Sequence, residues 1–343
     1  MIRFESDYTQ GATPEIIKRL ADTNMEMTPG YGEDHYCEAA AEKIKNEINM
    51  PSADVHFLVG GTQTNMLFIS SVLRPHQGVM CAVTGHINAH ETGAVEATGH
   101  KVIALPGDDG TLSADVIRET LDSHYADVTR EHIVQPAMVY VSFPTENGTL
   151  YSKAQLTAVS ELCRERDIPL YLDGARLGYG LMCSENDLTI GDIASLCDAF
   201  YIGGTKVGAL FGEALVITND KYKKDFRYIE KQKGAMLAKG RLLGLQFDTL
   251  FTDGLYYKIS SHAVNLAKKI RSAFEEKNIP LYFDSPTNQQ FPILTDEQMK
   301  KLGEEFAYSY WCKAGDKHAV RFCTSWATKQ EDVDKLIEAI NGL

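Results

Sequence analysis

Three short polar segments each follow an apolar run, and each carries residue types suited to chemistry. The first, VGGTQTN at 59–65, has two glycines and a threonine before an amphipathic segment. The second, YLDGAR at 171–176, places Asp173 at the end of an apolar run. The third, YIGGTKVGALFGEA at 201–214, holds Lys206 between glycines. Ligands of open α/β sheets bind beyond the carboxyl ends of the strands, so we expect these segments to meet at one site.

Each segment alone has an ordinary structural explanation. Gly60, Gly61 and Thr62 match turn and helix-start chemistry, and Asp173 suits a helix cap or a core ion pair. Lys206 differs, because lysine is rarely placed at the mouth of a buried strand unless it is paired or used. Together they offer helix-start N–H groups for a phosphate, a carboxylate for a ring nitrogen and an amine for an aldehyde. Pyridoxal 5′-phosphate (PLP) chemistry requires those groups.

Evidence for other ligand-binding motifs is weaker than the evidence for PLP. The chain has no G-x-G-x-x-G after a strand and no G-x-x-x-x-G-K-[ST], so dinucleotide and P-loop sites lack their usual marks. The segment GHINAHE places His86 and His90 four residues apart with Glu91 adjacent, a spacing that could hold a metal on a helix face. Because the H-E-x-x-H order is absent, a zinc hydrolase is only the runner-up, and no metal site is predicted.

A sheet must bring these segments together, and the chain has seven apolar runs suited to strands. Helical patterns separate most of them, such as 152–166 with Leu156, Val159 and Leu162 on one face. Strands that alternate with helices predict an α/β fold with a mainly parallel, doubly wound sheet. The seven runs begin at Val55, Val79, Lys101, Ala137, Pro169, Ala199 and Ala214.

The pattern changes after about residue 245, where longer helical segments and short strands predict a smaller α+β domain. A chain of 343 residues is longer than one core usually fills, which also favours two domains. We predict an N-terminal arm and large domain at 1–245 and a C-terminal domain at 246–343. Its expected elements are a helix at 256–277, strands PLYF from Pro280 and FPIL from Phe291, a helix at 296–312, a strand AVRFCTSW from Ala319 and a helix from Lys329.

Composition restricts the partners and the compartment. The formal net charge of -13 argues against a nucleic-acid partner, because such binding depends on Lys and Arg that neutralise phosphates. No run approaches the ~18 apolar residues of a membrane span, and the start MIRFESDYTQ has no apolar signal region. We expect no membrane partner and a cytoplasmic location, where thiols stay reduced. The cysteines are scattered without a Cys-x-x-Cys pair, at Cys37, Cys81, Cys163, Cys183, Cys197, Cys312 and Cys323.

With these residues in place, the chain resembles the L-threonine aldolase / β-eliminating lyase family of fold-type-I PLP enzymes. The resemblance runs over nearly the whole length and implies an aspartate-aminotransferase-like fold. YGED and DGAR in this order are fairly specific, whereas GGT alone is not. The matching segments are SDYTQGAT from Ser6, YGED from Tyr31, GGTQTN from Gly60, GHINAHETGA from Gly85, LDGAR from Leu172, GGTKVG from Gly203 and VRFCTSWATKQEDVD from Val320.

The resemblance implies cofactor roles for the matching residues. Lys206 would hold PLP as a Schiff base, Asp173 would pair with the ring nitrogen, and His86 would lie over the ring. These three are also the expected catalytic residues. The phosphate would be held by Gly60, Gly61 and Thr62.

Substrate roles follow from the same resemblance. Ser6, Arg176 and Arg321 would receive the substrate carboxylate, since arginine suits a planar bidentate partner. From the residues alone, Arg321 is nearly as well explained as a surface strand residue. Glu91 and Asp34 are secondary candidates.

The resemblance also implies a homodimer or homotetramer with active sites shared between subunits. Many relatives have Ser-Gly-Thr where this chain has Gly60, Gly61 and Thr62, and Ser-Lys where it has Thr205 and Lys206. Relatives also carry a glycine-rich segment with an arginine where this chain reads QKGAMLAKGR. By analogy, that segment is expected to contact a neighbouring subunit's phosphate through Lys233, Lys239 or Arg241, which the sequence does not rank.

The implied reaction is retro-aldol cleavage of L-threonine, L-allo-threonine or a related β-hydroxy-α-amino acid to glycine and an aldehyde. His86 is expected to accept the β-hydroxyl proton directly or through water, because imidazole titrates near neutral pH. His90 is a less favoured base. β-Elimination or transamination on the same scaffold is the alternative, because the sequence does not show which Cα bond is activated. A PLP-binding protein without activity is disfavoured by the presence of Lys206, Asp173 and His86 together.

Overall fold

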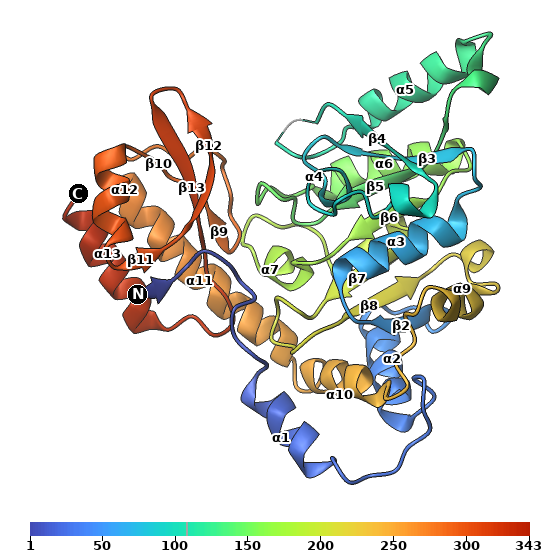
Figure 1. Cartoon of the computed structure of the whole chain (residues 1–343), viewed down its shortest axis with the longest axis horizontal. Helices are drawn as coiled ribbons and strands as arrows, with labels where there is room; N and C mark the ends of the chain where they lie inside the picture. The colour runs from blue at the N-terminus through green and yellow to red at the C-terminus, as the bar shows by residue number, and fades with distance from the viewer. Residues whose placement is uncertain (108) are drawn as a thin grey trace.

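A seven-stranded sheet dominates the computed structural model, which describes residues 1–107 and 109–343 (Figure 1). The strand order is β2-β8-β7-β6-β5-β3-β4. Neighbouring strands are parallel except at β8, which runs antiparallel to β7 and β2. The seven predicted strands and the mainly parallel α/β sheet are therefore confirmed. The strands are β2 (Asp54–Leu58), β3 (Gln77–Ala82), β4 (Lys101–Leu105), β5 (Gln135–Ser142), β6 (Leu170–Asp173), β7 (Ala199–Gly203) and β8 (Glu213–Ile217).

Both faces of this sheet are buried under helices. In β5, Val139 and Val141 join one hydrophobic cluster while Met138 and Tyr140 join another, because successive side chains point to opposite faces. This explains the nearly continuous apolar runs of the central strands. The first cluster takes side chains from α1 (Pro14–Asp22), α2 (His35–Glu47), α5 (Ala114–Ala126), α6 (Lys153–Glu165), α7 (Leu177–Leu181), α8 (Ile190–Leu196) and α10 (Arg241–Leu250), and the second from α3 (Gly61–Val72) and α9 (Phe226–Gln232). Short helices complete this region, namely α4 (His86–Ala89), η1 (Glu96–Thr98), η2 (Arg130–His132) and η3 (Asp220–Tyr222).

The helix predicted at 152–166 is α6, and its ends follow from local chemistry. The Ser152 side chain accepts a hydrogen bond from the backbone N–H of Gln155, whose side chain binds back to Ser152. This reciprocal cap satisfies two N–H groups that have no partner within the helix. The predicted apolar face is buried, with Leu156 and Leu162 inside the first cluster.

The C-terminal region has its own hydrophobic cluster, formed between α11 (Leu255–Glu276), α13 (Gln330–Asn341) and a small antiparallel sheet. The predicted helices at 256–277 and from Lys329 and the strand from Ala319 are confirmed. The small sheet comprises β9 (Gln289–Gln290), β10 (Ile293–Leu294), β12 (Ser309–Ala314) and β13 (Lys317–Cys323).

Two C-terminal predictions are wrong. The helix predicted at 296–312 is only α12 (Asp296–Gly303), because the aromatic-rich residues after Gly303 pair as β12 with β13 around the turn at Gly315, where φ is 66°. The predicted strand PLYF forms only an isolated bridge between Leu281 and Pro292, since proline has no N–H to continue the ladder.

The N-terminal arm lies against the C-terminal region, as Figure 1 shows. β1 (Ile2–Arg3) pairs in parallel with β11 (Phe306–Ala307), and Phe4 is buried in the C-terminal cluster. The arm then continues toward the large sheet. We retain the division between residues 245 and 246 as a proposal, and it falls within α10.

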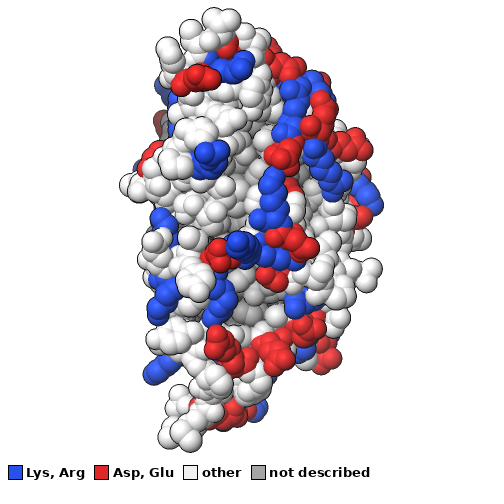
Figure 2. Space-filling view, turned by 90° about the vertical axis from the view of Figure 1, so that its right-hand side faces the viewer, with Lys and Arg blue, Asp and Glu red and all other residues white. Residues whose placement is uncertain are grey.

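Charges of both signs lie together on one face of the molecule. On the face seen in Figure 2, lysine and arginine side chains are intermixed with aspartate and glutamate. In the part of the chain that the structure describes, no helix is both long and apolar enough to cross a membrane.

Candidate active site

A cavity of about 330 Å³ opens where the parallel strands β5, β6 and β7 end. A neighbouring cavity of about 610 Å³ lies between this edge and the C-terminal strands and includes Arg321. His86, Arg176 and Lys206 line both cavities. The smaller cavity also brings together most of the other predicted site residues, namely Gly60, Gly61, Thr62 and Asp173.

Asp173 is the last residue of β6, and its buried carboxylate has four donors. Tyr140 and Tyr201 each donate a hydroxyl at 2.6 Å, Asn65 donates an amide N–H at 3.0 Å, and the backbone N–H of Ala175 donates at 2.9 Å. Burial opposes ionisation, but the nearby His86 and these hydrogen bonds outweigh it and lower the pKa of Asp173. An ionised carboxylate therefore persists inside the cavity.

The start of α3 faces the same cavity. Gly60 is the helix N-cap, and a side chain there would meet no atom within 4 Å, so the backbone is open to a ligand. A Cβ at Gly61 would lie only 2.9 Å from the hydroxyl of Tyr201. Backbone N–H groups at the start of a helix are suited to a phosphate, and Thr62 adds a hydroxyl in the first turn.

A buried amide connects two carboxylates of the site. Nδ2 of Asn65 donates to Oε1 of Glu91 at 2.8 Å and to Oδ2 of Asp173 at 3.0 Å. The hydroxyl of Tyr171 donates to Oδ1 of Asn65 at 3.0 Å, which fixes the orientation of the amide. Glu91 then lies 2.7 Å from Nδ1 of His86. Asp173 and His86 are thus joined through Asn65 and Glu91.

His86 lies at the start of α4, and negative groups surround it. Its backbone N–H donates to Oε1 of Glu146 at 2.9 Å. Burial alone would lower the pKa of His86, but the hydrogen bond to Glu91 and the charge of Asp173 raise it. Burial raises the pKa of Glu146. The site therefore favours a protonated His86.

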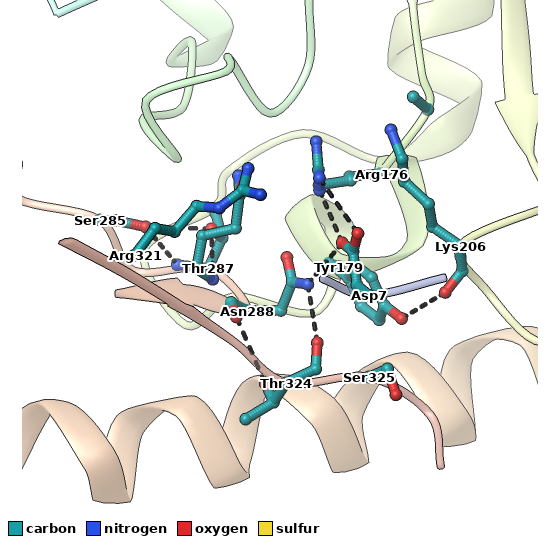
Figure 3. Close-up of polar contacts among 12 residues, drawn as sticks. Asp7, Arg176, Tyr179, Lys206, Ser285, Thr287, Asn288, Arg321, Thr324 and Ser325 are labelled. Carbon is teal, nitrogen blue, oxygen red and sulfur yellow. Dashed lines mark hydrogen bonds and ion pairs between the residues drawn. The ribbon is translucent and has the colours of Figure 1, made fainter. Parts of the chain in front are cut away.

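Lys206 lies on the short connection between β7 and β8. The backbone N–H groups of Gly204 and Thr205 both donate to the carbonyl of Gly212, at 3.0 and 3.1 Å, which closes the loop at its base. The hydroxyl of Tyr179 donates to the Lys206 carbonyl at 2.6 Å (Figure 3). Burial and then the charge of Arg176 lower the pKa of Lys206, although nearby carboxylates oppose this. A lowered pKa makes the amine a better nucleophile.

Glu213 begins β8 beside this loop and is a buried carboxylate of the same cavity. It accepts the backbone N–H of Gly204 at 3.1 Å. Burial raises its pKa to about 8, although the charge of Lys206 acts in the opposite direction. Glu213 therefore holds a proton near neutral pH more readily than an exposed glutamate does.

Arg176 is held by Asp7 of the N-terminal arm. Nε and Nη2 of Arg176 donate to the two oxygens of Asp7 at 2.7 and 3.1 Å, and Asn288 donates to Asp7 at 2.9 Å. In Figure 3 the charged ends of Arg176, Lys206 and Arg321 all lie above the carboxylate of Asp7. The arm thus positions Arg176 beside the amine of Lys206.

Arg321, on β13, is less fully engaged. Its Nη1 donates to Oε1 of Gln289 at 3.0 Å and its Nη2 to the carbonyl of Glu5 at 3.2 Å. Nε of Arg321 and Oγ of Ser6 are buried without a partner among the described residues. Ser6 is not among the residues that line either cavity, but it adjoins Glu5 and Asp7. These unsatisfied donors are suited to a carboxylate.

The remaining predicted candidates lie away from the two cavities. Arg241 is buried, and its Nη2 donates to the carbonyl of Thr23 at 2.8 Å. Lys239 is exposed and Lys233 is half-buried. Asp34 caps α2 by accepting two backbone N–H groups.

The zinc alternative required His86 and His90 on one helix face. Instead, α4 is a single turn that begins at His86, and His90 follows its last residue. Throughout residues 1–107 and 109–343, no group of three or more His, Cys, Asp or Glu side chains could hold a metal ion. His86 and His90 are neighbours, with ring centroids 5.6 Å apart, but the described residues do not supply the further ligands that the zinc alternative needs.

Several site residues were not predicted from the sequence. Asn65 has a usable signal, since it lies four residues after Gly61 and so on the same face of α3. Tyr140, Tyr201 and Glu213 fall inside or beside apolar strands, where nothing distinguishes a site residue from a core residue. Asp7 binds Arg176 across 169 positions of sequence, which no local pattern reveals.

Comparison with known proteins agrees with the geometry. The beta-eliminating lyase family model matches residues 3–335. A solved threonine aldolase from Leishmania major is 42% identical, covers 100% of this chain and 99% of that chain, and has a TM-score of 0.97. A low specificity L-threonine aldolase from a Pseudomonas species is 29% identical over 351 residues, which cover 99% of this chain and 97% of the relative. A variant of Thermus thermophilus aspartate aminotransferase, 16% identical with a TM-score of 0.72 over 100% of this chain and 92% of that one, shares the predicted fold. The chain belongs to the beta-eliminating lyase family.

Proposed function

We propose that this protein is a PLP-dependent carbon–carbon lyase that cleaves L-threonine, L-allo-threonine or a related β-hydroxy-α-amino acid to glycine and an aldehyde. The observation that carries the proposal is the convergence of Lys206, Asp173 and the start of α3 in one cavity of about 330 Å³. The similarity to the Leishmania major threonine aldolase over the whole chain supports it.

The residues of the cavity fit PLP. Lys206 would bind the aldehyde, Asp173 would pair with the protonated ring nitrogen, and His86 would lie against the ring. Gly60, Gly61 and Thr62 would hold the phosphate at the start of α3. When bound, PLP accepts the electron pair of a bond that breaks at the substrate α-carbon.

The substrate carboxylate would be held by Arg321, Arg176 and Ser6. The unpartnered Nε of Arg321 and Oγ of Ser6 support this assignment. Arg176 would use donors that remain after its two bonds to Asp7. With carboxylate and amine fixed, rotation about one axis selects the α-carbon bond that is activated, so positioning provides a large part of the catalysis.

We also propose that the protein is a homodimer or homotetramer with shared active sites, and that it is cytoplasmic. Two large apolar side chains, Met25 and Met27, are 88% and 100% exposed in the single chain, which supports burial against another subunit. The exposed Lys239 and half-buried Lys233 are better placed to reach a neighbour's phosphate than the buried Arg241. All seven cysteines are free, which supports a reducing compartment.

The test is a panel of amino acids incubated with the purified protein, with and without added PLP. We expect glycine and acetaldehyde from L-threonine or L-allo-threonine, with no requirement for a 2-oxo acid. Lys206→Ala serves as the matched inactive control. Pyruvate-dependent amine transfer, or ammonia release without glycine, would replace the aldolase proposal by transamination or β-elimination on the same fold.

A further inference from the structure

We propose that His90 accepts the β-hydroxyl proton of the substrate, and that His86 is instead a fixed hydrogen-bond donor within the site. This proposal rests on the proposed aldolase function. It exchanges the roles expected from the sequence, where His86 is the favoured base and His90 the less favoured one. Both imidazoles face the 610 Å³ cavity, with ring centroids 5.6 Å apart.

His86 is poorly arranged to accept a proton. Its Nδ1 lies 2.7 Å from Glu91, and the side chain of Glu91 is fully buried and held by Asn65. Glu91 and Asp173 both favour the imidazolium, against burial and the charge of Lys206, and an imidazolium carries protons on both ring nitrogens. An imidazolium donates hydrogen bonds and has no lone pair to accept a proton.

His90 has the opposite environment. Three cationic groups act on it, because Arg321 and Arg176 line the same cavity and His86 lies beside it. Partial desolvation in the cavity and these charges lower the pKa of His90, desolvation being the largest cause. No residue in the described ranges forms a hydrogen bond with the His90 ring, so its nitrogens are free for substrate. The other titratable groups of the cavity are Tyr8, Glu146, Lys206 and Tyr310.

The backbone presents His90 to the cavity. α4 ends after one turn, and the His90 N–H donates to the His86 carbonyl at 2.9 Å, which fixes the separation of the two residues. The side chain is exposed to the cavity and its solvent. His90 can therefore return an accepted proton to water after each turnover.

The proton transfer needs only the substrate, His90 and water. The β-hydroxyl O–H bond breaks and its proton moves to a neutral His90 nitrogen. The hydroxyl oxygen forms the aldehyde C=O bond as the Cα–Cβ bond breaks, and the electron pair of that bond stays with the α-carbon. A proton from water adds to the α-carbon to give glycine, and His90 gives its proton to water, so no proton is gained or lost overall. Arg321 and Arg176, which would hold the carboxylate, also help burial to keep His90 unprotonated, so the same two cations serve substrate binding and the protonation state of the base.

Two reactions of the holoenzyme separate the roles. Cleavage of L-threonine requires a base at the β-hydroxyl, whereas exchange of the glycine α-proton in D₂O has no β-hydroxyl to deprotonate. General-base removal typically costs ~10²- to 10⁴-fold in rate, so we expect His90→Asn to lose that much cleavage. Glycine exchange in the same variant should stay within about threefold of wild type. His86→Asn should slow both reactions, and His76→Asn, at an exposed position outside both cavities, should slow neither.

A second measurement does not depend on turnover. Histidine labelled with ¹³C should show, before and after PLP is added, a His90 titration midpoint below the ordinary value and a His86 midpoint above it. The acid limb of kcat/KM for threonine should follow the His90 midpoint, because the base is active only when unprotonated.

Each other outcome is decisive. Unchanged cleavage in His90→Asn, or equal loss of cleavage and exchange, overturns the proposal. Loss of cleavage alone in His86→Asn returns the base role to His86. If the wild-type protein cleaves no β-hydroxy-α-amino acid, the proposed function itself fails and the role of His90 fails with it.

Discussion

Glu91 and Asp173 share one hydrogen-bond donor, because Nδ2 of Asn65 lies 2.8 Å from the first carboxylate and 3.0 Å from the second. Asn65 is fully buried, and Tyr171 holds its amide oxygen. The carboxylate that we assign to the cofactor ring nitrogen and the one that binds His86 are therefore positioned by the same side chain. A change at Asn65 should reach both ends of the site.

Asn65→Leu should lower the free energy of unfolding of the PLP-free protein by about 1–3 kcal/mol, because both buried carboxylates lose a donor. PLP affinity should fall as well, since Asp173 is no longer held. Urea unfolding and a PLP fluorescence titration measure the two effects. Asn88→Leu is the matched control, because Asn88 is exposed and its side chain donates to the Val83 carbonyl rather than to a carboxylate. Equal effects in the two variants would remove the bridging role.

Lys206→Ala should abolish PLP that borohydride can fix to the protein. The amine lies in the predicted cavity and has a lowered pKa, whereas Lys224 is an exposed lysine outside it. Lys224→Ala should retain the fixed cofactor. Peptide mapping of reduced wild-type protein identifies the modified residue, and a cofactor on any other lysine would contradict the assignment.

Asp173→Asn should keep PLP bound but reduce turnover by about 10²- to 10³-fold, a typical cost of losing one charged or hydrogen-bonding group at a reacting centre. The amide preserves shape and loses the charge that keeps a ring nitrogen protonated. Tyr140→Phe, which removes one 2.6 Å hydrogen bond from Asp173, should cause a smaller loss. Absorbance of bound PLP and steady-state kinetics separate binding from turnover. Wild-type turnover in Asp173→Asn would exclude the role.

Asp7→Ala should lower the free energy of unfolding by about 3–5 kcal/mol at pH 7, because the variant leaves Arg176 buried without its partner. Burial opposes ionisation of Asp7, but Arg176 and Lys206 lower its pKa from 3.8 to about 2. Because the pKa is lower in the folded state, ionised Asp7 stabilises the fold at pH values above its unfolded-state pKa. This stabilisation is lost as the pH falls from about 4 toward 2. Urea unfolding at several pH values should show the variant and wild type converging in acid. A similar loss in Asp22→Ala, at an exposed position, would point to a general effect.

The protein should sediment as a dimer or a dimer of dimers. Replacing Met25 and Met27 by glutamate should shift the equilibrium toward monomer, since charged side chains would have to be buried at the proposed contact. Analytical ultracentrifugation with parallel activity assays checks this. A fully active wild-type monomer would contradict shared active sites.

The sheet was predictable because its strands are buried on both faces and read as apolar runs separated by helical patterns. Lys206 and Asp173 were predictable for a related reason, since each is a charged residue at the end of such a run. The strand β12 was missed because Ser309–Ala314 carries aromatic residues whose pairing depends on the turn at Gly315.

The residues that position the site, such as those that hydrogen-bond to Asp173, were not predictable from the sequence. Their roles depend on contacts between segments that are distant in the sequence. Tyr140 and Tyr201 donate to Asp173 from the neighbouring strands β5 and β7. In the local sequence, each looks like an ordinary residue of the hydrophobic core. The roles of the two histidines also depend on distant charges, since Arg321 lies more than two hundred positions from His90 in the sequence.

The closed loop between β7 and β8 limits how this family member can diversify. The carbonyl of Gly212 accepts the backbone N–H groups of Gly204 and Thr205. An insertion between Thr205 and Gly212 would therefore open the loop and displace Lys206. We therefore expect changes of substrate range to come from substitutions outside this loop. The 610 Å³ cavity is lined from other segments, with Tyr8 from the arm and Tyr310 and Trp311 from the C-terminal hairpin. Substitutions around this cavity can therefore change which aldehyde is released without moving the amine of Lys206.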